Sequence, residues 1–264
     1  MSLFRVCVYV GLALGLLTPL AGQQVSTSAP SGYTLLRRSL AAQVASNSIS
    51  GVTFTGTVRR IAGSDDESGT AILRATASGA ARVDLILPSG SHVEINDVFA
   101  TSPSGSWAGS DGASHSIVFH NLLSEPAWFF PAFAVSRALS PSKYSVAYVG
   151  EETRSSRTVR HIVLHQVLAN APGDTQLFEH LTRLDLYLDS GTLLPAALDF
   201  NVHPDNNAAI DIPVEVTYDD YRAVSGVQIP FHVQKYLNGS LFLDLQVDNA
   251  NLNSRLSLRA PEDK

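Results

Sequence analysis

Apolar and polar residues alternate along most of this chain with a period of two, the pattern of β-strands that bury one face. The alternation is clearest in residues 227–234, where Val227, Ile229, Phe231 and Val233 alternate with Gln228, His232 and Gln234. The pair Asn238-Gly239 follows this run and precedes another apolar run that ends near Asp248. Asn-Gly between two such runs predicts a hairpin, because both residues tolerate the positive φ of a type I′ turn. The stretch 218–253 therefore predicts antiparallel sheet.

Similar alternation predicts short strands over most of the chain upstream. The predicted strands are 52–58, 70–78, 81–87, 91–99, 143–151, 158–168, 184–189, 195–201 and 213–218. The polar segments 63–69, 101–114 and 169–179 are expected to be turns or loops. Short strands separated by turns predict an antiparallel meander rather than alternating strands and helices.

Two segments have a helical period instead. Residues 33–50 predict an N-terminal helix with Leu36 and Leu40 on its apolar side, because residues four apart share one helix face. Residues 117–139 are the most apolar part of the chain after its first 22 residues, and Pro131 is expected to break or kink the helix there. The pattern as a whole predicts a mainly β fold (α+β) with helices packed on one sheet.

The N-terminus has the features of a secretory signal peptide. Arg5 precedes an apolar run at 6–17, and small residues follow up to Gly22. The run is shorter than the roughly 20 apolar residues of a transmembrane helix, although an uncleaved anchor stays an alternative. We therefore expect an exported, periplasmic protein with no transmembrane segment after cleavage. The expected divisions are a signal peptide at 1–22, a flexible leader at 23–32 and a single domain at 33–264.

Charge and cysteine content narrow the possible partners and chemistry. The net charge is −6, and only three lysines occur, whereas phosphate binding needs a basic surface. Nucleic acid is therefore not an expected partner. The single cysteine, Cys7, lies inside the predicted signal peptide. The mature chain is expected to form no disulfide and to use no thiolate chemistry.

Motifs for catalysis or metal binding are weak. His161 and His165 are four residues apart in a predicted strand, which separates them by about 13 Å, too far for one metal ion to bridge. The segment 105–109 reads G-S-W-A-G and has Trp107 in the place of a nucleophilic serine. No catalytic residue, cofactor or metal site is predicted. A hydrolase whose serine, histidine and aspartate meet only in the fold stays a remote alternative.

Aromatic residues are concentrated in the central apolar segment. One interpretation is a helix packed against the core of the sheet. The other is that the same side chains line a cavity between sheet and helix that holds an acyl chain, since ligand pockets are mostly apolar. The candidate ligand-binding residues under the second interpretation are Trp128, Phe129, Phe130, Phe133, Leu36 and Leu40.

Two short motifs resemble the closing strands of LolA-like outer-membrane lipoprotein-sorting proteins. Residues 220–230 fit the form D-Y-x-x-x-x-G-V-x-I-P, and residues 184–195, L-D-L-Y-L-D-S-G-T-L-L-P, are similar to the strand-turn-strand form D-x-x-T-x-L-P. The resemblance implies a curved antiparallel sheet that forms an unclosed β-barrel, with the N-terminal helix and the central apolar helices packed on it as a lid. It also implies a cavity that binds acyl chains of lipoproteins or other lipids.

The sequence thus favours an exported binding protein or carrier for a lipid or acylated ligand, rather than an enzyme. The main alternative is a module of the same fold that binds an envelope protein for sensing or assembly.

Overall fold

The computed structural model describes residues 30–97, 103–168 and 175–253. The predicted signal peptide and most of the predicted leader lie outside the described residues. The strands are β1 Gly51–Ala62, β2 Asp65–Thr76, β3 Ala80–Leu87, β4 Gly90–Asp97, β5 Ser104–Ala108, β6 Ser114–Ser116, β7 Tyr144–Arg154, β8 Arg157–Gln166, β9 Leu184–Asp189, β10 Pro195–Val202, β11 Ile212–Val224, β12 Val227–Leu237 and β13 Ser240–Leu252. The helices are α1 Gly32–Val44, α2 Phe119–Leu122, α3 Ala132–Ala138 and α4 Thr175–Leu181.

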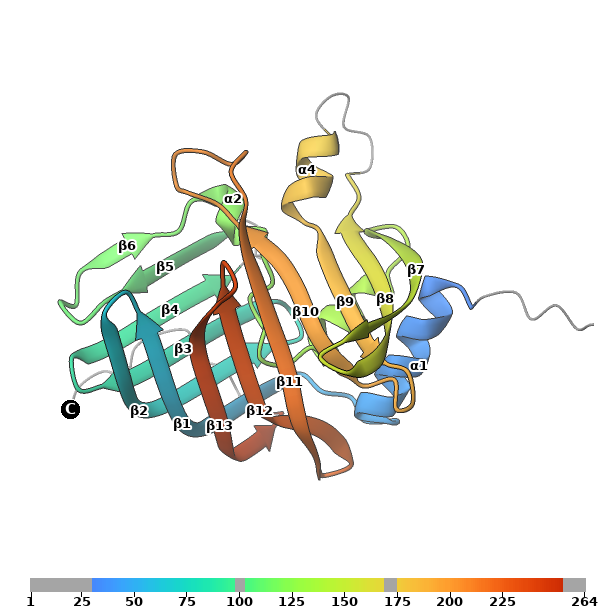
Figure 1. The fold of residues 1–264 in the computed structure, drawn as a ribbon, viewed down its shortest axis with the longest axis horizontal. Helices are drawn as coiled ribbons and strands as arrows, with labels where there is room; N and C mark the ends of the chain where they lie inside the picture. Colours follow the sequence, from blue (N-terminus) through green and yellow to red (C-terminus); the bar gives the residue numbers. More distant parts are fainter. Residues whose placement is uncertain (1–29, 98–102, 169–174, 254–264) are drawn as a thin grey trace, which may run out of the picture.

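The described strands form one antiparallel sheet in the order β6-β5-β4-β3-β2-β1-β13-β12-β11-β10-β9-β8-β7. The first strand pairs with the last, with Val52 opposite Leu252. The chain therefore starts in the middle of the sheet, winds outward to β6, and returns from the other edge at β7 (Figure 1). The sheet is curved and its edges do not pair in the described residues, which confirms the predicted mainly β, unclosed fold.

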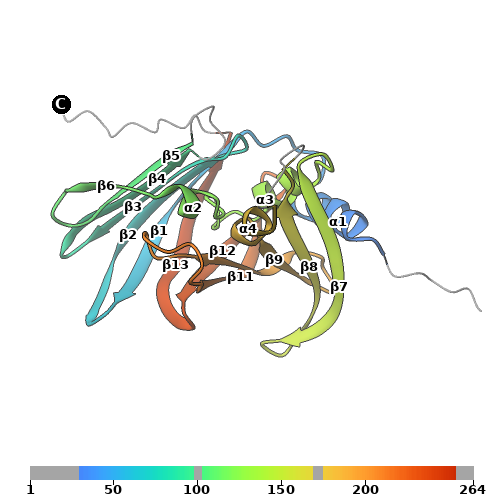
Figure 2. The ribbon, with the colours of Figure 1, turned by 90° about the horizontal axis from the view of Figure 1, so that it is seen from above.

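Residues 117–143, called the crossing segment below, connect the two edges of the sheet. This segment contains α2 and α3, and Figure 2 shows both helices inside the curve of the sheet. Pro131 is the N-cap residue of α3, with φ −64°. A proline is tolerated there, because the first N–H groups of a helix have no partner within it. The break predicted near Pro131 is thus confirmed, and the helices on either side of it are short.

The N-terminal helix is shorter than predicted, and its buried face is centred on different residues from those expected. It ends at Val44, with Ala45 at φ 51° after it, and Ser31 caps its start by accepting a hydrogen bond from the Thr34 N–H (3.2 Å). Its buried face includes Leu35 and Leu36, whereas Leu40 is only partly buried. The helix packs against α3, β7 and β12.

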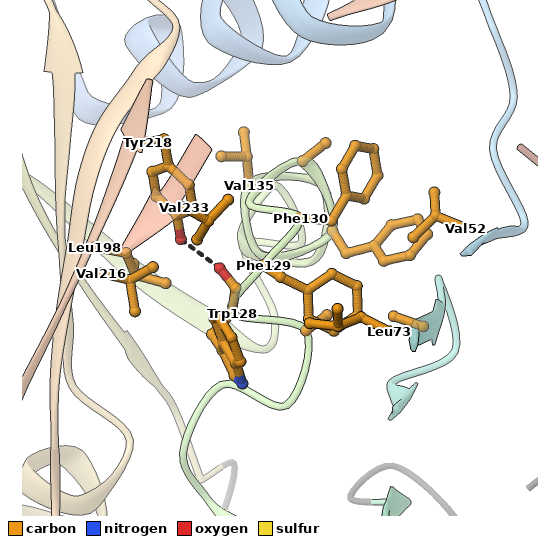
Figure 3. Packing of buried hydrophobic residues seen from close by; sticks show 14 of the residues in the cluster. Val52, Leu73, Trp128, Phe129, Phe130, Val135, Leu198, Val216, Tyr218 and Val233 are labelled. Carbon is orange, nitrogen blue, oxygen red and sulfur yellow. Dashed lines mark hydrogen bonds between the residues drawn. The ribbon is translucent and has the colours of Figure 1, made fainter. Parts of the chain in front are cut away.

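The core lies between the concave face of the sheet and the crossing segment. The ring of Phe54 on β1 makes edge-to-face contacts with Phe129 (5.6 Å between centroids) and Phe130 (5.9 Å). Each such pair contributes about 0.5–1.5 kcal/mol beyond its buried area. The Tyr218 hydroxyl donates a hydrogen bond to the Trp128 carbonyl (2.6 Å), which fastens the crossing segment to β11 (Figure 3).

Tight turns match the expectation from local sequence. Asn238 and Gly239 both have positive φ (49° and 76°) between β12 and β13, as a type I′ turn requires. Ser225-Gly226 has the same geometry (50° and 82°). The strand before this turn runs on to Val224, however, and does not end at Tyr218 as predicted.

Three polar segments predicted as turns or loops contain regular structure. Strand β2 begins at Asp65, so the first turn is only Gly63-Ser64. Strand β5 and the first residue of β6 lie within 101–114, where glycine and serine suggested a loop, and α4 begins within 169–179. None of the described helices is both long and apolar enough to cross a membrane.

Candidate ligand-binding site

Two adjoining cavities lie between the sheet and the crossing segment. Their volumes are about 200 Å³ and 210 Å³. Four residues line both of them: Glu94, Trp107, Trp128 and Lys235. The two cavities therefore meet at a junction formed by β4, β5, β12 and the crossing segment.

The cavities differ in character. The first is lined mainly by polar side chains near α2, including Asn96, Asn121 and Asp205. The second is lined more by apolar residues of β3 and β13, including Leu85 and Leu243. An elongated molecule with one apolar and one polar end matches this division, because ligand pockets combine apolar walls with a few polar groups.

Lys235 is the cation at the junction of the cavities. It continues the inward-facing series of Val227, Ile229, Phe231 and Val233 on β12. Its Nζ lies 4.8 Å from the centre of a Trp128 ring, a cation–π contact. Burial lowers the pKa of the Lys235 ammonium, while the negative charge of Glu94 opposes this shift. Among the described residues the Lys235 ammonium has neither a hydrogen bond nor an ion pair, and the Glu94 carboxylate acts on it only through its charge.

A row of polar side chains on β4 faces the cavities from the opposite wall. His92 pairs with Leu85 of β3, and Glu94 pairs with Val83, so this row shares the face that is apolar on the neighbouring strand. Burial lowers the pKa of His92, and the charge of Arg60 acts in the same direction. Glu94 accepts a hydrogen bond from Asn96 (2.8 Å).

Trp128 and His92 each have a buried ring nitrogen at the cavities for which no described residue provides a hydrogen-bond partner. The indole Nε1 of Trp128 and the Nε2 of His92 make no hydrogen bond with any described residue. In Figure 3 the Trp128 indole extends away from the Phe130 ring, with its nitrogen at the far end. Buried polar atoms are normally paired, so both atoms are available to a ligand.

A buried ion pair links two parts of the crossing segment beside the first cavity. Glu125 accepts hydrogen bonds from Arg137 of α3 and from the Ala127 N–H (2.9 Å). The Glu125 and Arg137 side chains are 4% and 13% exposed. Although burial disfavours the guanidinium charge, Glu125 raises the pKa of Arg137.

The structure places the six predicted ligand-binding residues in two groups. Trp128 lines both cavities. The others belong to the core or its margin: Phe129, Phe130, Phe133 and Leu36 are at most 3% exposed, and Leu40 is partly buried. Lys235 and the β4 row were not predicted. Lys235 could have been found from the alternation of β12, whereas the inward side of β4 depends on its register with β3.

His161 and His165 lie on β8, in the strand predicted for them. The His161 Nε2 is 2.7 Å from Asp185, and the His165 Nε2 is 4.0 Å from Glu179. They contact different carboxylates.

No family model matches the chain, and no curated protein matches it in sequence. Solved structures do match. A domain from Vibrio parahaemolyticus described as an outer membrane lipoprotein-sorting protein superposes with a TM-score of 0.51 and 11% identity, covering 86% of this chain and 94% of its own. A DUF1329 family protein from Desulfovibrio piger gives a TM-score of 0.50 and 10% identity, covering 86% and 93%.

A LolA superfamily protein from Nitrosomonas europaea gives a TM-score of 0.49 and 9% identity, covering 86% of this chain and 96% of its own. At these identities the likeness concerns the fold alone. The chain therefore has the fold of the lipoprotein-sorting domain from Vibrio, and the resemblance seen in the sequence is confirmed at the level of structure.

Proposed function

We propose that this protein is an exported carrier that binds an acylated amphiphile, with the anionic head group of the ligand next to Lys235. The observation that carries the proposal is the Lys235 ammonium, which no described residue pairs, at the junction of two cavities, one of them largely apolar. The role is binding rather than catalysis.

The charge of Lys235 specifies the polar end of the ligand. A cation withdrawn from water is costly unless it is paired. A carboxylate or phosphate at the junction pairs with the ammonium and accepts a hydrogen bond from the Trp128 N–H, which has no partner in the part of the chain that the structure describes. Charge-assisted hydrogen bonds of this kind are the stronger ones.

The apolar walls of the second cavity indicate that the other end of the ligand is apolar. Leu85, Leu243 and Phe242 line the second cavity, and each methylene buried there contributes about 0.8 kcal/mol. Either cavity alone, at about 200 Å³, is below the roughly 300–1,000 Å³ of typical ligand pockets. The ligand is therefore expected to occupy both, with its head group at the junction.

The shared fold supports a carrier role. The Vibrio domain of the same fold is named for lipoprotein sorting, so the acyl chains of a lipoprotein or a free lipid are the proposed ligand class. Export rests on the predicted signal peptide at 1–22.

The buried members of the predicted site are proposed to act differently from Trp128. Phe129, Phe130 and Phe133 pack in the core, so they reach a ligand only if the crossing segment moves away from the sheet. Phe129 also packs edge to face against Trp128, with 5.6 Å between ring centroids, and so helps to hold the indole beside Lys235.

Calorimetric titration with palmitate and with its neutral methyl ester, both below their aggregation concentrations, tests the proposal. Wild-type protein should bind palmitate more tightly than the ester. Lys235→Met should weaken palmitate binding roughly tenfold or more, because a hydrogen bond to a charged group contributes about 1.5–3 kcal/mol.

Lys143→Met is the matched control, since Lys143 is exposed, away from both cavities. It should bind palmitate as the wild type does. Failure of the wild type to bind either probe, or equal palmitate affinity in wild type and Lys235→Met, contradicts the proposal.

A further inference from the structure

Two histidines and an aspartate from separate parts of the chain meet beside α4. His180 is on α4, and His203 and Asp211 lie at the two ends of the connection between β10 and β11. One potential ligand atom from each lies within 4.8 Å of the other two. Asp211 Oδ1 is 2.9 Å from His180 Nε2 and 3.5 Å from His203 Nδ1.

His203 is the fixed member of this cluster. Its side chain is 1% exposed, and its Nδ1 lies 3.0 Å from the Ile210 carbonyl. Because a carbonyl only accepts hydrogen bonds, the proton of the neutral ring is on Nδ1 and Nε2 keeps its lone pair. That Nε2 is buried and has no hydrogen-bond partner among the described residues. A metal-bound histidine commonly has this arrangement, with one ring N–H donated to a carbonyl and the other nitrogen free to coordinate. The 3.5 Å contact with Asp211 is made by Nδ1, so coordination through Nε2 requires the Asp211 side chain to reorient.

The backbone around His203 is held by the crossing segment. The Asn121 side chain accepts a hydrogen bond from the His203 N–H (2.8 Å) and donates one to the His203 carbonyl (2.7 Å). The His120 Nε2 lies 3.1 Å from the Pro204 carbonyl, and its ring meets that of His203 edge to face at 5.9 Å. The histidine is thus positioned from two sides before any ligand binds.

We propose that His180, His203 and Asp211 form a binding site for a divalent transition-metal ion such as Zn²⁺. Two imidazoles and one carboxylate suit first-row transition metals, whereas Mg²⁺ and Ca²⁺ prefer oxygen ligands. Zinc bonds of about 2.0–2.2 Å in tetrahedral geometry place ligand atoms roughly 3.4 Å apart. His180 and Asp211 are 39% and 41% exposed, so their side chains are free to close on an ion held at His203.

An ion at this site ties α4 to the β10–β11 connection. Asn121, which holds His203, also lines the first cavity. The metal therefore stabilises a wall of that cavity, although the site itself does not depend on what the cavity binds.

Zinc titration of the tag-free, chelator-treated protein by calorimetry tests the site. We expect saturable uptake of one ion per chain and a rise in Tm, because a ligand that binds only the folded state stabilises it. His180→Ala and Asp211→Asn should each weaken zinc binding at least tenfold. Both side chains are partly exposed, so the fold should survive, which circular dichroism verifies.

His232→Ala is the matched control. The His232 Nε2 lies 2.9 Å from Asp244, the same separation as His180 from Asp211. Among the described residues, however, this pair belongs to no group of three potential metal ligands. The variant should therefore bind zinc as the wild type does. No saturable zinc uptake, unchanged affinity in both His180→Ala and Asp211→Asn, or equal uptake of Mg²⁺ overturns the proposal.

Discussion

Asp199 on β10 has a carboxyl group in surroundings that disfavour its charge. Burial raises its pKa to about 6, Arg154 opposes the shift, and Glu215 adds to it by repulsion. The Arg154 guanidinium lies 2.7 Å from Asp199 and 2.8 Å from Glu215, so one cation serves two carboxylates. The Asp199 Oδ1 has no hydrogen-bond partner among the described residues.

This shift gives stability a defined pH dependence. The unfolded chain has the ordinary aspartate pKa of about 3.9, so between about pH 4 and pH 6 the folded state binds more protons. Stability from this group is therefore greatest below pH 4, falls as pH rises through this window, and is constant above it. Relative to Asp199→Asn, the wild type should lose roughly 2–3 kcal/mol between pH 4 and pH 7. Urea unfolding at pH 4 and pH 7 measures the free energy of unfolding of both proteins. The same difference between wild type and Asp199→Asn at the two pH values contradicts the raised pKa.

The Glu125–Arg137 pair provides a second prediction at the scale of residues. Glu125→Gln leaves a buried guanidinium without its carboxylate, which should lower the free energy of unfolding by about 3–5 kcal/mol. Glu151→Gln is the control, because Glu151 is 50% exposed in its pair with Arg160 and surface pairs contribute about 0–1 kcal/mol. Equal losses in the two variants, measured by urea denaturation, would contradict a larger contribution of the buried pair to stability.

Among the elements, the pairing of β1 with β13, the first and last described strands, joins the two halves of the sheet at its middle. The register shifts between Thr55 and Gly56. A Cβ on Gly56 would lie 2.0 Å from the Gln246 carbonyl oxygen. This oxygen belongs to the backbone, so no side-chain rotation can relieve the clash. The closeness of the two strands at this point depends on glycine.

Gly56→Ala should therefore lower the free energy of unfolding by about 1–3 kcal/mol, the cost of overpacking a close contact. Amide hydrogen exchange should accelerate first in β1 and β13. Gly191→Ala is the control, because the nearest atom to its added Cβ is a side-chain oxygen at 3.4 Å. A Gly56→Ala protein as stable as wild type would contradict the close approach.

Elements set by local sequence could be predicted, and those set by pairing could not. The Asn238-Gly239 hairpin follows from two residues that accept positive φ. In contrast, β5 is rich in serine and glycine, which have low strand propensity, and it forms because Trp107 pairs with Glu94 of the neighbouring strand. Which side chains of β4 face inward likewise depends on how β4 pairs with β3. Glu94 was therefore not predicted as a site residue.

At the scale of the whole molecule, the position of the crossing segment follows from the strand order. Because β6 and β7 are consecutive strands at opposite edges, the chain between them has to pass from one edge to the other, and it does so inside the curve of the sheet (Figure 2). The apolar character of this segment predicted its packing. Which of its side chains face a cavity depends on how the sheet curves, and a sequence pattern does not contain that information.

The most direct test of the proposed carrier role is native mass spectrometry of the protein purified from its exporting cells without detergent. We expect the protein mass together with a one-to-one adduct of lipid mass, and reduced adduct in Lys235→Met but not in Lys143→Met. A mass of the protein alone, with no uptake of added palmitate or an acylated peptide, would contradict the binding of an acylated ligand.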